Sequence, residues 1–133
     1  MTGIDRQKRL RDFIEPIARQ PVKWGRDDCT AMAARWVSSE RGIDIPIPDY
    51  SSEASALDMI SSAGSLEAIW SRALRLAGVF ETVSPSYGDV GIVDTGRFGP
   101  VGVIFCIDGL ALWRSESGVS IFRPRNIIKA WAV

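Results

Sequence analysis

Cys29 is the residue of this 133-residue chain whose type and position best fit nucleophilic chemistry. It directly follows Asp27 and Asp28 and begins a stretch with helical spacing, so we expect its thiol in the first turn of a helix. Unpaired backbone N–H groups at a helix N-terminus favour the thiolate, which is the reactive form of cysteine. The position therefore indicates a thiol that could attack a carbonyl group.

The chain contains no histidine to activate this thiol. A cysteine nucleophile is usually paired with an imidazole that takes its proton and returns it to the leaving group. The helix dipole contributes only about 0.3–1 kcal/mol, and the neighbouring Asp27 and Asp28 raise the thiol pKa, so we expect Cys29 to stay mostly protonated at pH 7. The alternative interpretation of Cys29 is a small buried residue on an apolar helix face, where free cysteine is common.

The composition fits one domain over residues 1–133, which is large enough to bury about two-thirds of the surface of its unfolded chain. Sixteen Lys and Arg residues balance sixteen Asp and Glu residues. The chain therefore lacks the basic excess that electrostatic binding of nucleic acid requires, and we expect no nucleic-acid partner. The N-terminus turns charged at once and no apolar run reaches about eighteen residues, which predicts no secretory signal, no membrane span and synthesis in the cytoplasm.

The two cysteines, Cys29 and Cys106, fit no metal-ligand spacing. Because the absence of histidine removes most zinc ligand sets as well, we expect neither a metal nor another cofactor. Cys106 lies in an apolar run typical of a core strand, and a disulfide between the two cysteines is not expected in a chain without an export signal.

Helices are predicted in the first part of the chain. The spacing indicates helices over residues 4–19, where Pro16 must kink or end the helix, over 29–41, 52–63 and 65–77, with an extended loop at 43–48. The helix that begins at Cys29 has Asp27 or Asp28 as N-cap and Gly42 beyond its C-terminus. Its apolar face consists of Cys29, Met32, Ala33, Trp36 and Val37.

Strands are predicted in the second part. Short β-rich runs separated by glycine-containing turns cover residues 79–80, 89–94, 101–107, 110–113 and 119–122. Residues 126–129 are expected to form one turn before a terminal strand. Helices followed by strands predict an α+β fold in which the helices pack on one antiparallel sheet. We expect the helix of Cys29 to lie against the strand at 101–106.

Several short motifs resemble a known family. Trp24-Gly25 followed by Asp28-Cys29-Thr30-Ala31 resembles the nucleophile motif of the NlpC-type cell-wall cysteine peptidases, which have a compact papain-like fold. Further along, 88–90 (Gly-Asp-Val) and 101–103 (Val-Gly-Val) resemble the starts of the first two central strands of that family. The ending at 128–133 resembles a histidine-poor branch encoded in phage tail modules. The resemblance implies a papain-like, NlpC-type arrangement with N-terminal helices on a C-terminal antiparallel sheet.

The chain departs from this family at two of its three catalytic positions. Active members have a histidine directly before the second strand, where this chain has Pro100, and a polar residue one strand later. That later position corresponds to Trp113, or to Arg114 with one residue of slippage. None of these side chains can act as a general base at neutral pH, so the resemblance implies a degenerate active site in which only Cys29 is retained.

The residues around Cys29 each have two interpretations. Trp24, Gly25 and Arg26 are candidates for lining a substrate groove, and Arg26 could meet a carboxylate there. The structural alternatives are that Trp24 packs beside the helix, that Gly25 permits a tight approach, and that Arg26 is solvated. Asp28 is most simply a helix cap near the site.

The resemblance predicts a phage or prophage tail component, located in the tail tip of the virion, whose partners are other tail proteins such as the hub. The enzymatic alternative is a thiol peptidase or amidase that cleaves cell-wall peptides, with Cys29 attacking the carbonyl and its own N–H stabilising the oxyanion. A toxin or small-molecule acyl hydrolase built on the same frame is a third class. The absence of histidine counts against both enzymatic classes, although water or a partner's side chain could supply a base.

Overall fold

The computed structural model describes residues 3–47 and 49–133 of the chain. Met1, Thr2 and Pro48, which belong to the predicted domain and to the predicted 43–48 loop, lie outside the described residues. Helices come first and strands afterwards, as predicted. The elements are α1 (Gly3–Ile14), α2 (Cys29–Arg41), α3 (Glu53–Ala63), α4 (Leu66–Leu76), β1 (Val90–Asp94), β2 (Pro100–Phe105), the 3₁₀ turn η1 (Ile107–Gly109), β3 (Ala111–Arg114), β4 (Val119–Phe122) and β5 (Ile127–Trp131).

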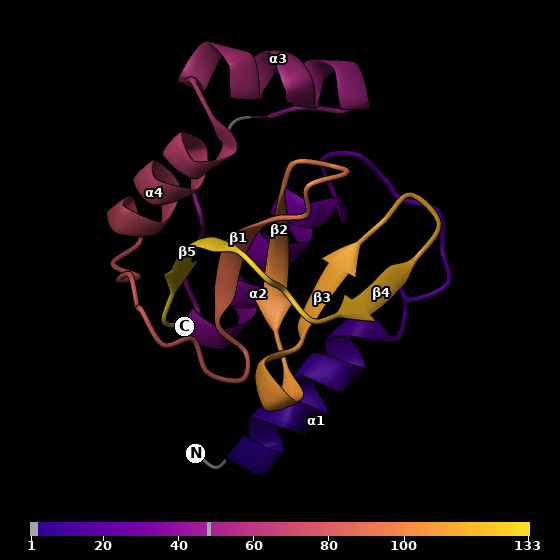
Figure 1. Cartoon of the computed structure of the whole chain (residues 1–133), viewed down its shortest axis with the longest axis vertical. Helices are drawn as coiled ribbons and strands as arrows, with labels where there is room; N and C mark the ends of the chain where they lie inside the picture. The colour runs from indigo at the N-terminus through magenta and orange to yellow at the C-terminus, as the bar shows by residue number, and fades with distance from the viewer. Residues whose placement is uncertain (1–2, 48) are drawn as a thin grey trace.

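The five strands form one antiparallel sheet in the order β4-β3-β2-β1-β5. The first four strands follow one another as a meander, whereas β5 pairs with β1 at the opposite edge from β4. The connection between β4 and β5 must therefore cross the sheet, and Figure 1 shows it passing over the face turned away from α2. This architecture confirms the predicted α+β class with an antiparallel sheet.

The helix α2 forms as its sequence predicts. The carboxylate of Asp28 accepts a hydrogen bond from the Ala31 N–H, and Gly42 ends the helix in the left-handed conformation, with φ of 68°. The apolar face of α2 packs on β2, which confirms the predicted position of the Cys29 helix. The fully buried side chains of this face are Met32, Ala33, Trp36 and Val37.

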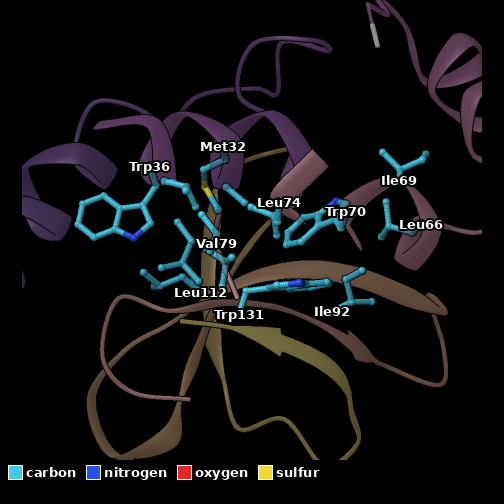
Figure 2. Packing of buried hydrophobic residues seen from close by; sticks show 14 of the residues in the cluster. Met32, Trp36, Leu66, Ile69, Trp70, Leu74, Val79, Ile92, Leu112 and Trp131 are labelled. Carbon is cyan, nitrogen blue, oxygen red and sulfur yellow. The ribbon is translucent and has the colours of Figure 1, made fainter. Parts of the chain in front are cut away.

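The main core lies between the sheet and the helices α2 and α4. Figure 2 shows Trp36 and Met32 of α2, Trp70 of α4 and Trp131 of β5 gathered in this layer. Two of the indole N–H groups are satisfied inside the core: Trp36 donates to the Gly88 carbonyl oxygen at 2.7 Å, and Trp70 donates to Thr30 Oγ1 at 3.0 Å. The second of these bonds ties α4 to the first turn of α2, next to Cys29.

Three predicted elements differ from the structure. The first helix ends at Ile14 and residues 15–19 form turns, because Pro16 supplies no N–H for a continued helix. Residues 79–80 are not a strand, since only Glu81 forms an isolated bridge, to Trp131. The predicted turn at 126–129 is wrong, because the predicted terminal strand, β5, already begins at Ile127, and the pairing of this segment with β1 overrides its local pattern.

Candidate functional site

Cys29 occupies the first position of α2 and carries a free, half-buried thiol. Its backbone lies close to β2, because a Cβ atom added to Gly102 would come within 3.4 Å of the Cys29 carbonyl oxygen. Burial raises the pKa of the thiol, the backbone hydrogen bond from Gly102 partly opposes this, and the Asp28 carboxylate raises the pKa further. The surroundings therefore favour the protonated thiol, in the direction predicted from the sequence.

Asp28 is a buried carboxylate that organises the start of α2. One of its oxygens accepts the Gly25 N–H at 2.7 Å, and the other accepts the Ala31 N–H at 3.5 Å and the hydroxyl of Tyr50. Burial and the bond to Asp28 raise the pKa of Tyr50, so its hydroxyl remains a donor. Asp28 is thus the predicted helix cap and also the anchor of two loops.

Gly25 fills a position that only glycine fits. Its φ is 82°, and a Cβ atom added there would collide with the carbonyl oxygen of Tyr50. This tight approach is the structural interpretation that the sequence suggested. Gly25 also borders a hollow of about 500 Å³ on the outer side of α2, together with small residues of α2 and with Ile45 and Ile47, but the lining of that hollow does not include Cys29.

Trp24 and Arg26, the other two groove-lining candidates, flank Gly25 without lining that hollow. Trp24 is half-buried, whereas Arg26 is exposed. The Arg26 carbonyl oxygen accepts a hydrogen bond from Arg35 Nη1 at 3.2 Å, which joins this loop to α2. Arg26 therefore has the solvated side chain that the structural interpretation describes.

The two degenerate catalytic positions lie on different faces of the sheet. Pro100 is exposed at the start of β2 and, by the alternation along the strand, shares the helix-facing side with Gly102. Trp113 lies on the opposite side, where its ring packs between Phe98 and Phe122 with centroid separations of 5.1 and 6.4 Å. Trp113 therefore points away from Cys29.

Arg114, the alternative to Trp113, lies on the helix-facing side of β3, as Leu112 does. Its guanidinium is fully buried and makes five hydrogen bonds: to the carbonyl oxygens of Ile17, Gln20, Pro21 and Asp27 at 2.8–3.1 Å and to the Asp27 carboxylate at 3.1 Å. A guanidinium has five N–H donors, so none remains for a substrate. Arg114 holds the loop between α1 and α2 against the sheet.

The Asp27 side chain stabilises the same loop between α1 and α2. Its Oδ1 accepts both the Lys23 N–H at 2.7 Å and the Arg114 guanidinium, and its side chain is almost fully buried. The polar groups that precede Cys29 thus stabilise the local fold. Nowhere in the described part of the chain do three or more Cys, Asp or Glu side chains cluster as metal ligands would.

Two structural contributors to the site were not identified from the sequence. Tyr50 reaches Asp28 from a loop 22 positions away, and no local pattern indicates where that loop returns. Arg114 reaches the loop between α1 and α2 only because of the register of β3. The sequence pointed to Arg114 solely as an alternative to Trp113 at the third catalytic position. A satisfied buried arginine requires acceptors close by, which only the folded chain supplies.

The fold and this site define an α+β domain with a free thiol at the start of its central helix. The family described as a domain of unknown function, DUF6950, matches residues 3–133, and the chain belongs to this family. No curated protein matches the sequence. No helix among residues 3–47 and 49–133 has the length and apolar character needed to cross a membrane.

Proposed function

We propose that the protein is a non-catalytic relative of the NlpC-type, papain-like cysteine peptidases and serves as an assembly component of a phage or prophage tail tip. The observation that carries the proposal is the Arg114 guanidinium, whose five donors all bind protein oxygens. With one residue of slippage, Arg114 corresponds to the position where active NlpC-type peptidases have a polar catalytic residue. A buried, fully paired cation cannot accept a proton from Cys29.

Three further features support the papain-like part of the proposal. Cys29 is the first residue of a helix that packs on an antiparallel sheet, as the nucleophile of that fold would be. Gly102 of the Val-Gly-Val motif lies against the backbone of Cys29. Pro100, at the position of the catalytic histidine, stands two residues before Gly102 on the same side of β2 and offers no titratable group.

Because the thiol site lacks a base, we propose that the domain binds other proteins instead of catalysing a reaction. The outer side of α2 offers a hollow lined by small and apolar residues, among them Ala34, Ile45 and Ile47, and also by the charged Arg35 and Asp44. A partner could bury apolar side chains there and pair with these two charges. We propose that other tail proteins, such as the hub, dock at this side of the domain. The protein would then be made in the cytoplasm and end in the virion tail.

The enzymatic alternative keeps one observation in its favour. Cys29 is a free, half-buried thiol at a helix N-terminus, where its own N–H could stabilise an oxyanion. A thiol peptidase or amidase would need a base from water or from a partner subunit. Burial and Asp28 both raise the Cys29 pKa, which counts against this alternative.

The test compares the purified protein with its Cys29→Ala variant on muropeptides, alone and together with the tail proteins encoded beside it. A positioned general base contributes about 10²–10⁴-fold in rate, so we expect turnover near background in every mixture. Cys106→Ala is the matched control, because it removes a thiol in another part of the core. The infectivity of virions that carry each variant is measured in parallel.

Cleavage that depends on Cys29 would overturn the proposal, and cleavage only with partners present would mean that another subunit supplies the base. The tail assignment is tested separately by the neighbouring genes. Tail-tube, tape-measure and hub genes on either side would support it, and their absence would contradict it.

A further inference from the structure

A second hollow lies on the face of the sheet that is turned away from α2 and Cys29. It has a volume of about 410 Å³ and is bordered by the β1–β2 hairpin, by β3 and β4, and by the β4–β5 connection. In Figure 1 this connection crosses the sheet on the viewer's side, while α2 lies behind. The hollow is therefore separate from the site described above.

Three aromatic rings line this hollow. Phe98 extends from the β1–β2 hairpin and is 57 % exposed, although its ring packs on Trp113 with a centroid separation of 5.1 Å. The rings of Trp113 and Phe122 meet in a T-shaped arrangement with a centroid separation of 6.4 Å. Exposed aromatic surface beside a hollow is characteristic of binding sites rather than of a closed core.

Three arginines also line this hollow: Arg97, Arg123 and Arg125. The Arg97 guanidinium lies 5.1 Å from the centre of the Phe98 ring, and Arg123 donates to the Asp108 carbonyl oxygen at 3.1 Å. Arg125 is exposed, and among the described residues its side chain has neither a hydrogen bond nor an ion pair. These three guanidinium groups keep donors available on the side of the hollow that faces solvent.

The charge of the hollow is not balanced by its own residues. Asp94 is the single carboxylate in its lining, and one oxygen of Asp94 already accepts the Gly96 N–H at 2.8 Å. Three arginines against one aspartate leave a local charge of +2 in a chain whose net charge is zero. This charge and the exposed aromatic rings suit a ligand that combines anionic groups with an apolar part.

We infer that this hollow binds an extended acidic segment of another protein, in which carboxylate side chains flank one apolar or aromatic side chain. Arginine and aromatic residues are enriched at the centres of protein interfaces, where an aromatic anchor fills a hollow and arginine pairs with carboxylates. The net charge of zero disfavours nucleic acid as the occupant, because such polyanions are held by a basic excess over a whole face. The inference does not rest on the function proposed for the Cys29 side.

The test uses a fluorescein-labelled peptide in which glutamates flank a single phenylalanine, with fluorescence anisotropy as the readout. The matched control peptide has glutamines in place of the glutamates. We expect the acidic peptide to bind, the neutral peptide to bind much more weakly, and the affinity to fall as NaCl is added, because salt screens exposed charges. Amide chemical shifts of Gly96 and Gly99, in the hairpin at this hollow, should change, whereas those of Gly25 should not.

Two variants measure separately how the arginine charge and the exposed aromatic ring contribute to the affinity for the peptide. Arg125→Gln removes a guanidinium without a protein partner, and we expect about a two- to fivefold loss of affinity with folding unchanged. Phe98→Ala removes the exposed ring and should weaken binding by a similar or larger factor. Arg75→Gln, an exposed arginine of α4, is the control that should leave the affinity unchanged.

Three results would overturn the inference. The first is the absence of binding at millimolar peptide. The second is binding that Arg125→Gln and Phe98→Ala both leave unchanged. The third is equally tight binding of an oligothymidylate, which would assign the hollow to polyanions in general.

Discussion

The guanidinium of Arg114 on β3 lies 3.1 Å from the carboxylate of Asp27, two residues before Cys29. The same guanidinium also bonds the Asp27 carbonyl oxygen at 3.0 Å, so both the side chain and the backbone of Asp27 are fixed against the sheet. The residues that lead into α2 are therefore held by a strand 87 positions further along the chain. The position of the Cys29 thiol depends on this contact.

Replacing Arg114 by methionine should destabilise the protein severely. The variant leaves the Asp27 carboxylate buried without its cation and removes the donor from four backbone carbonyl oxygens. Breaking a buried pair of this kind costs about 3–5 kcal/mol. Urea denaturation measures the free energy of unfolding. Arg125→Met, at an exposed arginine without a partner among the described residues, should change it by less than about 0.5 kcal/mol. Equal losses for the two variants would contradict the role of Arg114.

Comparing Gly25→Ala with Gly96→Ala should separate two reasons for the need for glycine: a close steric contact and a positive φ. Gly25 and Gly96 both have positive φ, 82° and 76°, but the added methyl group would strike the Tyr50 carbonyl oxygen only at Gly25. We expect Gly96→Ala to cost about 1 kcal/mol, as for a left-handed residue in open space, and Gly25→Ala to cost at least 1 kcal/mol more. Thermal unfolding of the two variants checks the order. If Gly96→Ala proves as costly, the close approach to Tyr50 is not the reason that glycine is needed.

The helix of Cys29 could be predicted because all of its determinants are local. Asp28 caps it, Gly42 ends it, and the apolar spacing from Met32 to Val37 sets its buried face. Each of these interactions joins residues only a few positions apart, so the sequence alone carries the information. The four strands of the meander were predictable for the same reason, since turns with glycine separate them.

The remaining features depend on contacts between distant parts of the chain. A shift of one residue in the register of β3 exchanges Trp113 for Arg114 on the helix-facing side, and no local pattern fixes that register when both faces of the strand are buried. Tyr50 meets Asp28 through a loop with no periodic pattern. The pairing of β5 with β1 spans more than thirty positions and overrides the turn predicted at 126–129.

The Cys29 thiol should titrate above the ordinary cysteine value. Burial raises its pKa and Asp28 raises it further, so alkylation by iodoacetamide in a Cys106→Ala background should have its midpoint above about 8.5. Asp28→Asn should lower that midpoint, because it removes the negative charge. Asparagine keeps one oxygen for the helix cap at Ala31, although it loses the second acceptor, which binds the Gly25 N–H. A midpoint near 6 in the parent protein would reveal an activating group and would support the enzymatic alternative.

The same pKa shift should make the stability of the protein fall in alkaline solution. The contribution of Cys29 is fully present below the unfolded-state pKa of about 8.5 and is lost as the pH rises through the higher pKa of the folded state, because the unfolded chain releases the proton first. The loss occurs between the two pKa values and can reach at most about 1.4 kcal/mol per pH unit for this one group. We expect the free energy of unfolding to be lower at pH 9.5 than at pH 8.5. Urea denaturation under reducing conditions at both pH values measures it.

The Cys29→Ala variant isolates this contribution, because it retains the other groups that lose stability in alkali. Burial also raises the pKa of Cys106 and of Tyr50, and these terms are common to both proteins. The free energy of unfolding should therefore fall less steeply with pH in Cys29→Ala than in the parent protein. If the free energy of unfolding falls equally steeply with pH in both proteins, the pKa of Cys29 is the same in the folded and unfolded chain. Burial at the start of α2 would then not raise that pKa.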